Sequence, residues 1–277
     1  MNTAQAADMN LKKLNWNVVW QEARRQRKND RHDNSYWNSR APSFAKHAKK
    51  SGYARNFLRL MAPQAHWSVL DVGCGAGTLA LPLAGLVQQV TAIDFSDVMI
   101  SILGERCRKL GIANVTPRVL GWENNWDRAG IGVHDVAIAS RSLVVDDLYA
   151  AITKLDQKAR RKVFISSLVG DGPFDLRIFD AIGRELDRGP DYICVYNLLN
   201  QMGIFADVTF VLNGNSGKIY RDMEEAVQSF RWMIDTLTAE EEARLRIYLE
   251  QHLVKKEGGW TFSYRHVVRW AIISWSK

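Results

Sequence analysis

The chain has 277 residues, of which 47% are apolar and 24% charged, as is usual for a folded globular protein. This composition excludes a disordered chain, a collagen-like chain and a coiled-coil rod. No apolar run approaches the ~20 residues of a membrane-spanning helix, and the polar stretch 1–10 lacks the pattern of a signal peptide. Because Cys74, Cys107 and Cys194 show neither a disulfide framework nor metal-ligand spacing, we expect a cytoplasmic protein without a metal site.

The positive charge of the chain is concentrated at its N-terminal end. Residues 1–60 hold 13 Lys and Arg against 4 Asp and Glu, a net charge of +9, whereas residues 61–277 hold 24 against 26. We therefore expect an N-terminal helical arm or lid over 1–60 and a main domain over 61–277. The arm is either a solvated face of amphipathic helices or a clamp for an anionic partner such as nucleic acid. Its basic residues include Lys12, Lys13, Arg24, Arg25, Arg27, Lys28 and Arg31.

Helical spacing in the arm and an alternating pattern after it predict an α/β protein. Apolar residues within 11–28 recur at helical intervals, and further helices are expected around Phe44 and from near Ser51. From Trp67 onward, short apolar runs alternate with helical segments, which indicates crossover units and a mainly parallel sheet. The predicted strands are 68–72, 90–93, 115–120, 135–139 and 163–168, and the clearest helices are 98–110 and 146–161.

The last hundred residues follow a looser order. A helix with Pro173 in its first turn is followed by a second short helix ending near Gly203. We predict a sixth strand over 204–212 and a last strand over 261–275. A helical cap is expected to be inserted between them, at about 214–260. Its predicted parts are one amphipathic helix from Met223 to Ile234 and a second that opens with the capping-box pattern Thr238-Ala239-Glu240-Glu241.

A glycine-rich turn follows the first predicted strand. The segment Val69-Leu70-Asp71-Val72-Gly73-Cys74-Gly75-Ala76-Gly77 joins a buried strand to a helix. Glycines allow positive φ and let a ligand approach the backbone, and the helix that follows offers free N–H groups. Asp94 ends the next strand, where a carboxylate can accept hydrogen bonds from ribose hydroxyls. Thr78 occupies the third glycine position of the dinucleotide fingerprint, which disfavours a nicotinamide cofactor.

These residues resemble those of class I S-adenosylmethionine-dependent methyltransferases of the small-molecule type. The resemblance covers roughly 35–213 and the last strand, and it implies a Rossmann-like, seven-stranded, mostly parallel sheet with helices on both faces. It implies S-adenosyl-L-methionine as the cofactor and S-adenosyl-L-homocysteine as the product. The implied cofactor-binding residues are Asp71, Gly73, Cys74, Gly75 and Gly77 at the methionine end, Asp94, Phe95, Ser96 and Met99 around the ribose and adenine, Trp122 and Glu123 beside the adenine, and Ser140 near the methyl group.

The segment after the fourth predicted strand bears on the methyl acceptor. Nucleic-acid amino methyltransferases often carry Asn/Asp-Pro-Pro-aromatic there, whereas this chain has Ser140-Arg141-Ser142-Leu143. We therefore expect direct in-line transfer to an oxygen or nitrogen atom of a small molecule. In-line alignment supplies much of the rate, so a general base is optional. The candidate catalytic residues are Arg141, His252 and His266.

Two further hypotheses concern an N-terminal lid and the alternatives to a small-molecule enzyme. Tyr36, Trp37 and Arg40 resemble the N-terminal lid of small-molecule methyltransferases, although Trp37 would equally suit packing against the sheet. The alternatives to a small-molecule enzyme are an RNA methyltransferase that uses the basic arm and a non-catalytic protein that only binds the cofactor. RNA binding through the arm would weaken steeply with salt.

Overall fold

A computed structural model of the chain describes residues 14–26, 36–38, 41, 52–186, 188–214, 218–231, 233–234 and 236–277. Most of the predicted arm, including Arg40 and the helix expected around Phe44, lies outside these residues. The chain divides into two compact units. Unit 1 consists of Met1–Ser167, Gly189–Val211 and Ala271–Lys277, and unit 2 consists of Leu168–Arg188 and Leu212–Trp270.

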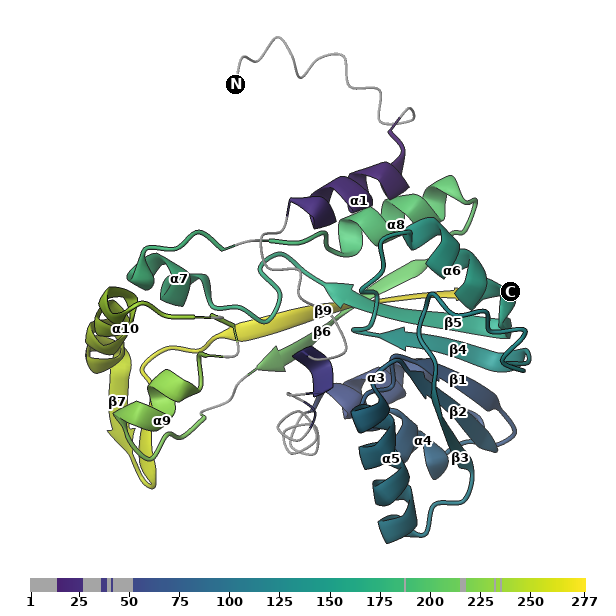
Figure 1. Cartoon of the computed structure of the whole chain (residues 1–277), viewed down its shortest axis with the longest axis horizontal. Helices are drawn as coiled ribbons and strands as arrows, with labels where there is room; N and C mark the ends of the chain where they lie inside the picture. Colours follow the sequence, from purple (N-terminus) through teal and green to yellow (C-terminus); the bar gives the residue numbers. More distant parts are fainter. Residues whose placement is uncertain are drawn as a thin grey trace. The chain divides into compact units, whose positions relative to one another are not determined.

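A seven-stranded sheet forms the centre of unit 1 (Figure 1). The strands are β1 (Ser68–Val72), β2 (Gln89–Asp94), β3 (Val115–Val119), β4 (His134–Ser140), β5 (Ala159–Leu168), β6 (Asp207–Gly214) and β9 (Val267–Ser276). The helices of unit 1 are α1 (Trp16–Arg25), α3 (Tyr53–Met61), α4 (Ala80–Ala84), α5 (Asp97–Leu110), α6 (Leu148–Gln157) and α8 (Tyr192–Gln201). No described helix is both long and apolar enough to cross a membrane.

The strand order is β3-β2-β1-β4-β5-β9-β6, and neighbouring pairs from β3 to β5 are parallel. The backbone N–H of Lys277 donates to the carbonyl of Arg161 at 2.8 Å, so the end of β9 lies beside the start of β5 and the two strands are antiparallel. The predicted fold class, a mostly parallel Rossmann-like sheet of seven strands, is confirmed. The order reverses between β1 and β4, and such a switch point opens a crevice at the carboxyl ends of the strands.

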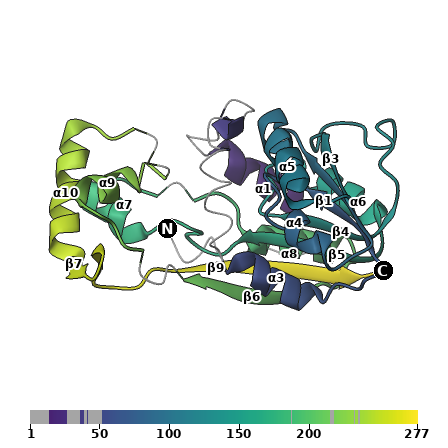
Figure 2. The same ribbon diagram turned by 90° about the horizontal axis from the view of Figure 1, so that it is seen from below.

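Buried strands and helices on both faces hold this sheet in place. All five residues of β1 are buried, as expected for a central parallel strand. Figure 1 shows α1, α6 and α8 grouped on one side of the sheet, and Figure 2, seen from below, shows α3 in front of β6 and β9. The short α4 contains Pro82, and a proline inside a helix removes a backbone donor and limits the length of the helix.

Two predicted elements near the C-terminus are wrong in their extent. The strand predicted over 261–275 is divided, because β8 (Gly259–Phe262) pairs with β7 (Leu253–Lys256) in a separate antiparallel hairpin before β9 begins. The turn at Gly258 and Gly259 requires φ values of +87° and +146°, which favour glycine. The helix predicted from Met223 to Ile234 ends at Gln228, where Ser229 Oγ donates to the carbonyl of Ala226 and competes with helical backbone bonding.

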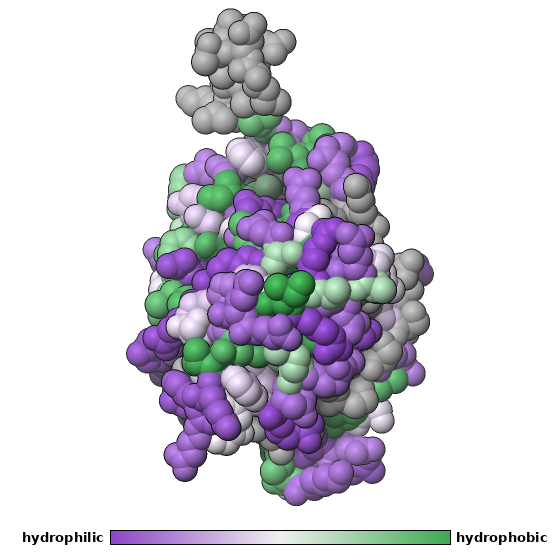
Figure 3. Space-filling model, turned by 90° about the vertical axis from the view of Figure 1, so that its left-hand side faces the viewer, coloured by the Kyte–Doolittle hydropathy of each residue, from purple (hydrophilic) through white to green (hydrophobic). Residues whose placement is uncertain are grey.

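Unit 2 has a hydrophobic core of its own. It contains the stretch 214–260 expected as a cap, and it also includes α7 (Leu176–Ile182), which comes from an earlier part of the chain. Its other helices are α9 (Met223–Gln228) and α10 (Ala239–His252). Buried residues of α7, α9 and α10 pack together, among them Ile178, Val227 and Leu249. In Figure 3, hydrophilic residues dominate the face on the left-hand side of Figure 1, and apolar side chains are scattered over it.

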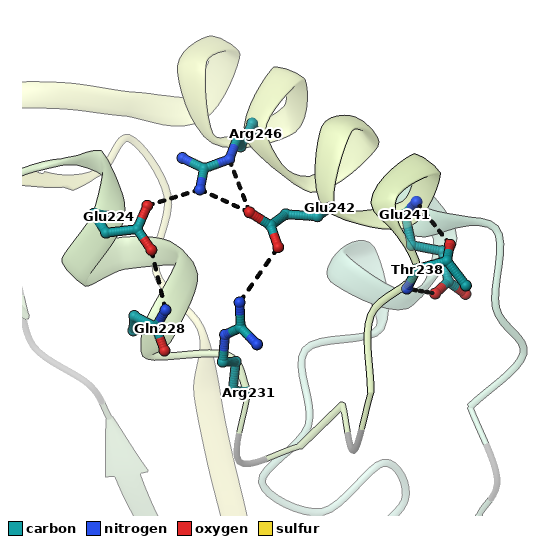
Figure 4. A network of polar contacts seen from close by, with 7 residues as sticks. All are labelled: Glu224, Gln228, Arg231, Thr238, Glu241, Glu242 and Arg246. Carbon is teal, nitrogen blue, oxygen red and sulfur yellow. Dashed lines mark hydrogen bonds and ion pairs between the residues drawn. The ribbon is translucent and has the colours of Figure 1, made fainter.

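The predicted capping box at the start of α10 is present (Figure 4). The backbone N–H of Glu241 donates to Thr238 Oγ1 at 3.2 Å, and the N–H of Thr238 donates to Glu241 Oε2 at 2.8 Å. Beside it, Arg246 bridges Glu224 and Glu242, linking α10 to α9. These contacts satisfy N–H groups that would otherwise lack partners at the helix start.

We expect Thr238→Ala to lower the free energy of unfolding of unit 2 by about 1 kcal/mol, because alanine cannot accept the N–H of Glu241. Chemical denaturation followed by circular dichroism measures the loss. Thr238→Ser is the matched control, since serine keeps the accepting oxygen, and it should remain close to the parent protein. Equal stability of the alanine variant and the parent would contradict the capping role.

Candidate functional site

A cavity of about 340 Å³ opens where the carboxyl ends of β1, β2 and β4 meet. These parallel strands bring together residues that are far apart in the sequence, because their ends lie at one edge of the sheet. The lining residues are Trp37, Asp71, Val72, Gly73, Cys74, Gly75, Thr78, Leu79, Asp94, Phe95, Met99, Leu120, Gly121, Trp122, Glu123, Ser140, Arg141, Ser142 and Val144. Most of the lining is apolar or aromatic, and two carboxylates face it from β1 and β2.

The glycine-rich loop forms the floor of the cavity. The N–H groups of Gly73 and Cys74 both donate to the carbonyl of Ile93, at 2.8 and 3.0 Å, which ties the loop to β2. Gly73 has φ +69° and Gly75 has φ +54°, so both adopt a conformation that residues with a Cβ rarely reach. The loop therefore presents bare backbone to the cavity, where a ligand can lie close to it.

Asp94 is held in one orientation at the end of β2. Its Oδ2 accepts the N–H of Gly75 at 2.8 Å, and its Oδ1 accepts the N–H of Ser96 at 2.9 Å. Burial raises the pKa of this carboxyl, and the two backbone bonds oppose that rise. Each carboxylate oxygen can accept more than one hydrogen bond, so both remain able to receive the hydroxyls of a ribose.

Asp71 places a buried carboxyl in the same cavity. Its side chain is only 1% exposed, and Oδ2 has no hydrogen-bond partner among the residues the structure describes. Burial and the neighbouring charge of Asp94 raise its pKa to about 7, against an opposing hydrogen bond from the N–H of Ala80. Buried polar atoms are normally paired, so this oxygen is available to accept a hydrogen bond from a ligand. A cationic ammonium would form the strongest such bond.

Aromatic side chains form one wall of the cavity. Trp122 Nε1 donates to the carbonyl of Ser142 at 2.8 Å, which fixes the indole beside β4. The rings of Trp122 and Trp126 lie 5.4 Å apart. Phe95 and Met99 line the cavity from the loop after β2 and from α5. A flat apolar wall of this kind suits a heteroaromatic base.

A cluster that the sequence did not indicate supports the wall after β4. The hydroxyl of Tyr53 in α3 donates to Ser166 Oγ at 2.6 Å and lies 2.7 Å from Ser140 Oγ. The guanidinium of Arg141 stacks over the Tyr53 ring at 4.1 Å, and Arg141 has φ +58°. A backbone held in this region marks a constrained position, of the kind that clusters at ligand sites. No motif pointed to Tyr53, because its partners lie on strands distant in the sequence.

Most of the predicted site residues that the structure describes in unit 1 line the cavity, and three do not. Ser96 caps the start of α5 and its hydroxyl donates to Asn38 Oδ1, while Gly77 packs closely against Leu81 and Leu103. Tyr36 lies edge-on to Trp37, which itself lines the cavity and packs against Ala76 and Met99. Arg40, also predicted for the site, lies outside the described residues.

The two candidate histidines belong to unit 2. His252 stacks on the Tyr248 ring at 4.0 Å, and its Nδ1 lies 2.8 Å from the backbone carbonyl of Tyr248. His266 Nδ1 lies 3.7 Å from Asp175 Oδ2. Neither histidine is among the residues that line the cavity of unit 1.

The fold and the cavity together define the class of this protein. A doubly wound sheet in this order, with a glycine loop after β1 and a carboxylate at the end of β2, is typical of α/β domains whose ligands contain a nucleoside. The comparisons with known proteins agree. Residues 69–162 match the family described as a methyltransferase domain.

An uncharacterized protein of Haemophilus influenzae is 33% identical to this chain over 242 residues, covering 87% of this chain and 88% of that protein. A Bacillus halodurans structure assigned as a methyltransferase has a TM-score of 0.54 at 12% identity, covering 81% of this chain and 98% of the other. The YcgJ protein of Bacillus subtilis has a TM-score of 0.53 at 12% identity, covering 81% and 97%. The chain belongs to one family with this Haemophilus protein, and its residues 69–162 form a methyltransferase domain.

Proposed function

We propose that this protein transfers the methyl group of S-adenosylmethionine directly to an oxygen or nitrogen atom of a small molecule. The observation that carries the proposal is the buried Oδ2 of Asp71, which lacks a partner among the described residues and lines the same cavity as Asp94. One carboxylate is placed for an ammonium group and the other for a pair of hydroxyls. S-adenosylmethionine has both groups, together with a base that suits the aromatic wall.

The residues of the cavity fit this cofactor part by part. Asp71 would hold the α-ammonium of its methionine moiety, Asp94 the ribose hydroxyls, and Trp122 one side of the adenine. The cofactor supplies a methyl group activated by its positively charged sulfur. The protein then has to hold the acceptor atom in line with the sulfur–methyl bond, and such positioning lowers a barrier by about 7–11 kcal/mol.

The pairing of two arginines in the arm supports a small acceptor over RNA. Of the seven basic residues named for the arm from Lys12 to Arg31, the structure describes two: Arg24 lies 3.3 Å from Asp146, and Arg25 lies 3.6 Å from Glu22. An arginine paired within the protein is less suited to clamp a phosphate backbone.

The three cysteines are free and buried, which supports a reducing compartment such as the cytoplasm.

Ligand-dependent stabilisation tests the cofactor assignment. At 100 times its Kd, S-adenosylhomocysteine should stabilise the protein by ~2.7 kcal/mol, while NAD at the same concentration should have no effect. Transfer of labelled methyl from S-adenosylmethionine to a panel of small hydroxyl and amine compounds then tests turnover. Stabilisation by NAD would reject the cofactor, and binding without transfer to any acceptor would favour a non-catalytic protein.

We expect Asp94→Asn to weaken binding of S-adenosylhomocysteine about 10- to 100-fold. The amide keeps one accepting oxygen but loses the charge that strengthens the hydrogen bonds to the ribose hydroxyls. Isothermal titration calorimetry measures the change. Glu105→Gln is the matched control, because it removes a carboxylate from the exposed side of the adjacent α5. Equal losses in both variants would show a general charge effect and contradict the ribose role.

A further inference from the structure

Unit 2 contains a second cavity, of about 550 Å³, whose described lining residues all belong to that unit. It lies between the β7–β8 hairpin, the segments that flank α9, and the stretch before α7. The cavity is larger than the one in unit 1 and has a different lining. None of its residues belongs to the glycine loop or to the strand ends of the first site.

Aromatic rings form the apolar part of this lining. The ring of Phe262 lies at the centre of the group, with its centroid 6.2 Å from that of Tyr220, 5.9 Å from Phe230 and 4.8 Å from Tyr264. Met233 adds a flexible side chain to the same lining. Flat rings in edge-on and tilted contact offer a surface on which a ring, or another flat apolar group, can pack.

Positive charge surrounds the aromatic surface. Lys218, Lys256 and Arg265 all line the cavity, whereas Asp175 supplies its only carboxylate among the described lining residues. The negative charge of that carboxylate is already balanced within the protein, because Arg177 Nε and Nη2 donate to its two oxygens at 2.8 and 3.1 Å. The fixed charge of the lining therefore favours an anion.

One lysine of the lining lies beside an aromatic ring. Lys218 Nζ lies 4.8 Å from the centroid of the Tyr220 ring. Neighbouring protein atoms lower the pKa of its ammonium by desolvation, which Glu225 opposes. A cation with reduced access to water interacts more strongly with an anion than a fully solvated one does.

Two polar groups at the cavity have hydrogen-bonding capacity to spare. His266 Nε2 is buried and has no hydrogen-bond partner within the described part of the chain. Tyr264 accepts a hydrogen bond from the Tyr248 hydroxyl at 2.9 Å, and burial raises the pKa of Tyr264, so its own proton remains available for donation. Buried polar atoms without partners are rare in folded proteins, and at a cavity they indicate a polar ligand group.

We propose that this cavity is a binding site for a small organic anion that has a ring or another flat apolar body. The acidic group, a carboxylate or a phosphate ester, lies against Lys218 and Lys256, and the body packs on Phe262 and its neighbouring rings. His266 and Tyr264 provide the remaining polar contacts. This site is distinct in its residues from the cofactor cavity, so it adds a second recognition function to the protein.

Titration calorimetry on the full chain tests the proposal with three matched probes. These are 2-naphthoate, 2-naphthyl phosphate and the uncharged 2-naphthamide, with saturating S-adenosylhomocysteine present to fill the first cavity. We expect at least one anion to bind about tenfold more tightly than the amide, because the charge-assisted bonds to lysine are absent from the amide. The stronger of the two anions identifies a carboxylate or a phosphate site. Equal binding of the amide and both anions, or no binding of any probe, would overturn the proposal.

Neighbouring lysines on β7 provide a matched pair of variants. Lys256 lines the cavity, whereas Lys255 does not, because successive residues of a strand face opposite sides. Both are exposed, so neither substitution should disturb the core. We expect Lys256→Gln to weaken binding of the preferred anion about fivefold and Lys255→Gln to leave it unchanged. Equal loss in both variants, or loss in neither, contradicts the assignment of the anion to this cavity.

Discussion

Replacing Gly73 with alanine should lower the free energy of unfolding of unit 1 by roughly 2–5 kcal/mol. Gly73 has φ +69°, and a Cβ built there would lie 2.2 Å from Ser142 Cβ and 2.9 Å from Ser142 Oγ. The serine cannot easily move, since its hydroxyl donates to the carbonyl of Val72 at 2.6 Å. The variant therefore carries both backbone strain and a clash in the floor of the cofactor cavity.

Gly85→Ala is the matched control for this prediction. Gly85 ends α4 with φ −82°, and nothing lies within 4 Å of a Cβ added there. Alanine should leave the stability within about 1 kcal/mol of the parent, with a small gain from reduced freedom of the unfolded chain. Ser142→Gly in the Gly73→Ala background should restore part of the loss by removing the clashing atoms. Urea unfolding measures all three, and a Gly73→Ala protein as stable as the parent would contradict the close approach.

The ligand-free protein should become less stable as the pH rises from 4 to 8, because of Asp71. Its pKa of about 7 in the folded state lies above the ordinary value of 3.8, so the unfolded chain releases this proton first. The contribution is fully present below about pH 4 and is lost as the pH approaches 7. A difference of about three units corresponds to a loss on the order of 4 kcal/mol.

Asp71→Asn should remove this part of the pH dependence. The amide carries no charge at any pH, so at pH 8 the ligand-free variant should be more stable than the parent by roughly 1–3 kcal/mol, after allowance for its own unpaired polar atoms. The same variant should bind S-adenosylhomocysteine more weakly, because its ammonium loses a charged partner. Urea unfolding at pH 5 and pH 8, with and without the ligand, measures both effects.

Proton release provides a second readout for Asp71. Near pH 6, ligand binding should release a proton from the parent protein, since the ammonium of the ligand favours the ionised carboxylate. Calorimetry in buffers of different ionisation enthalpy detects this proton, and the Asn variant should not release it. Identical pH profiles of stability and binding in the two proteins would show that Asp71 is not the titrating group.

The sequence by itself determined the features that depend on neighbouring residues. The strand, the glycine loop and Asp94 were recognisable because each uses a short pattern of apolar, glycine and acidic residues. The capping box at Thr238 and Glu241 was recognisable for the same reason, since its two partners lie three residues apart. The alternation of strands and helices likewise determined the class of fold, because crossover connections leave a parallel sheet as the natural arrangement.

Only the tertiary structure decided which distant segments meet. It joined Tyr53 to Ser140 and Ser166 across three elements, and it combined α7 with α9 and α10 in one core. It also divided the last predicted strand, because a glycine turn pairs β8 with the neighbouring β7 and because Trp260 pairs with the remote Tyr220. The charged and aromatic cavity of unit 2 arises in the same way. Packing between remote segments follows from shape and burial over the whole chain, and no local pattern of residues specifies it.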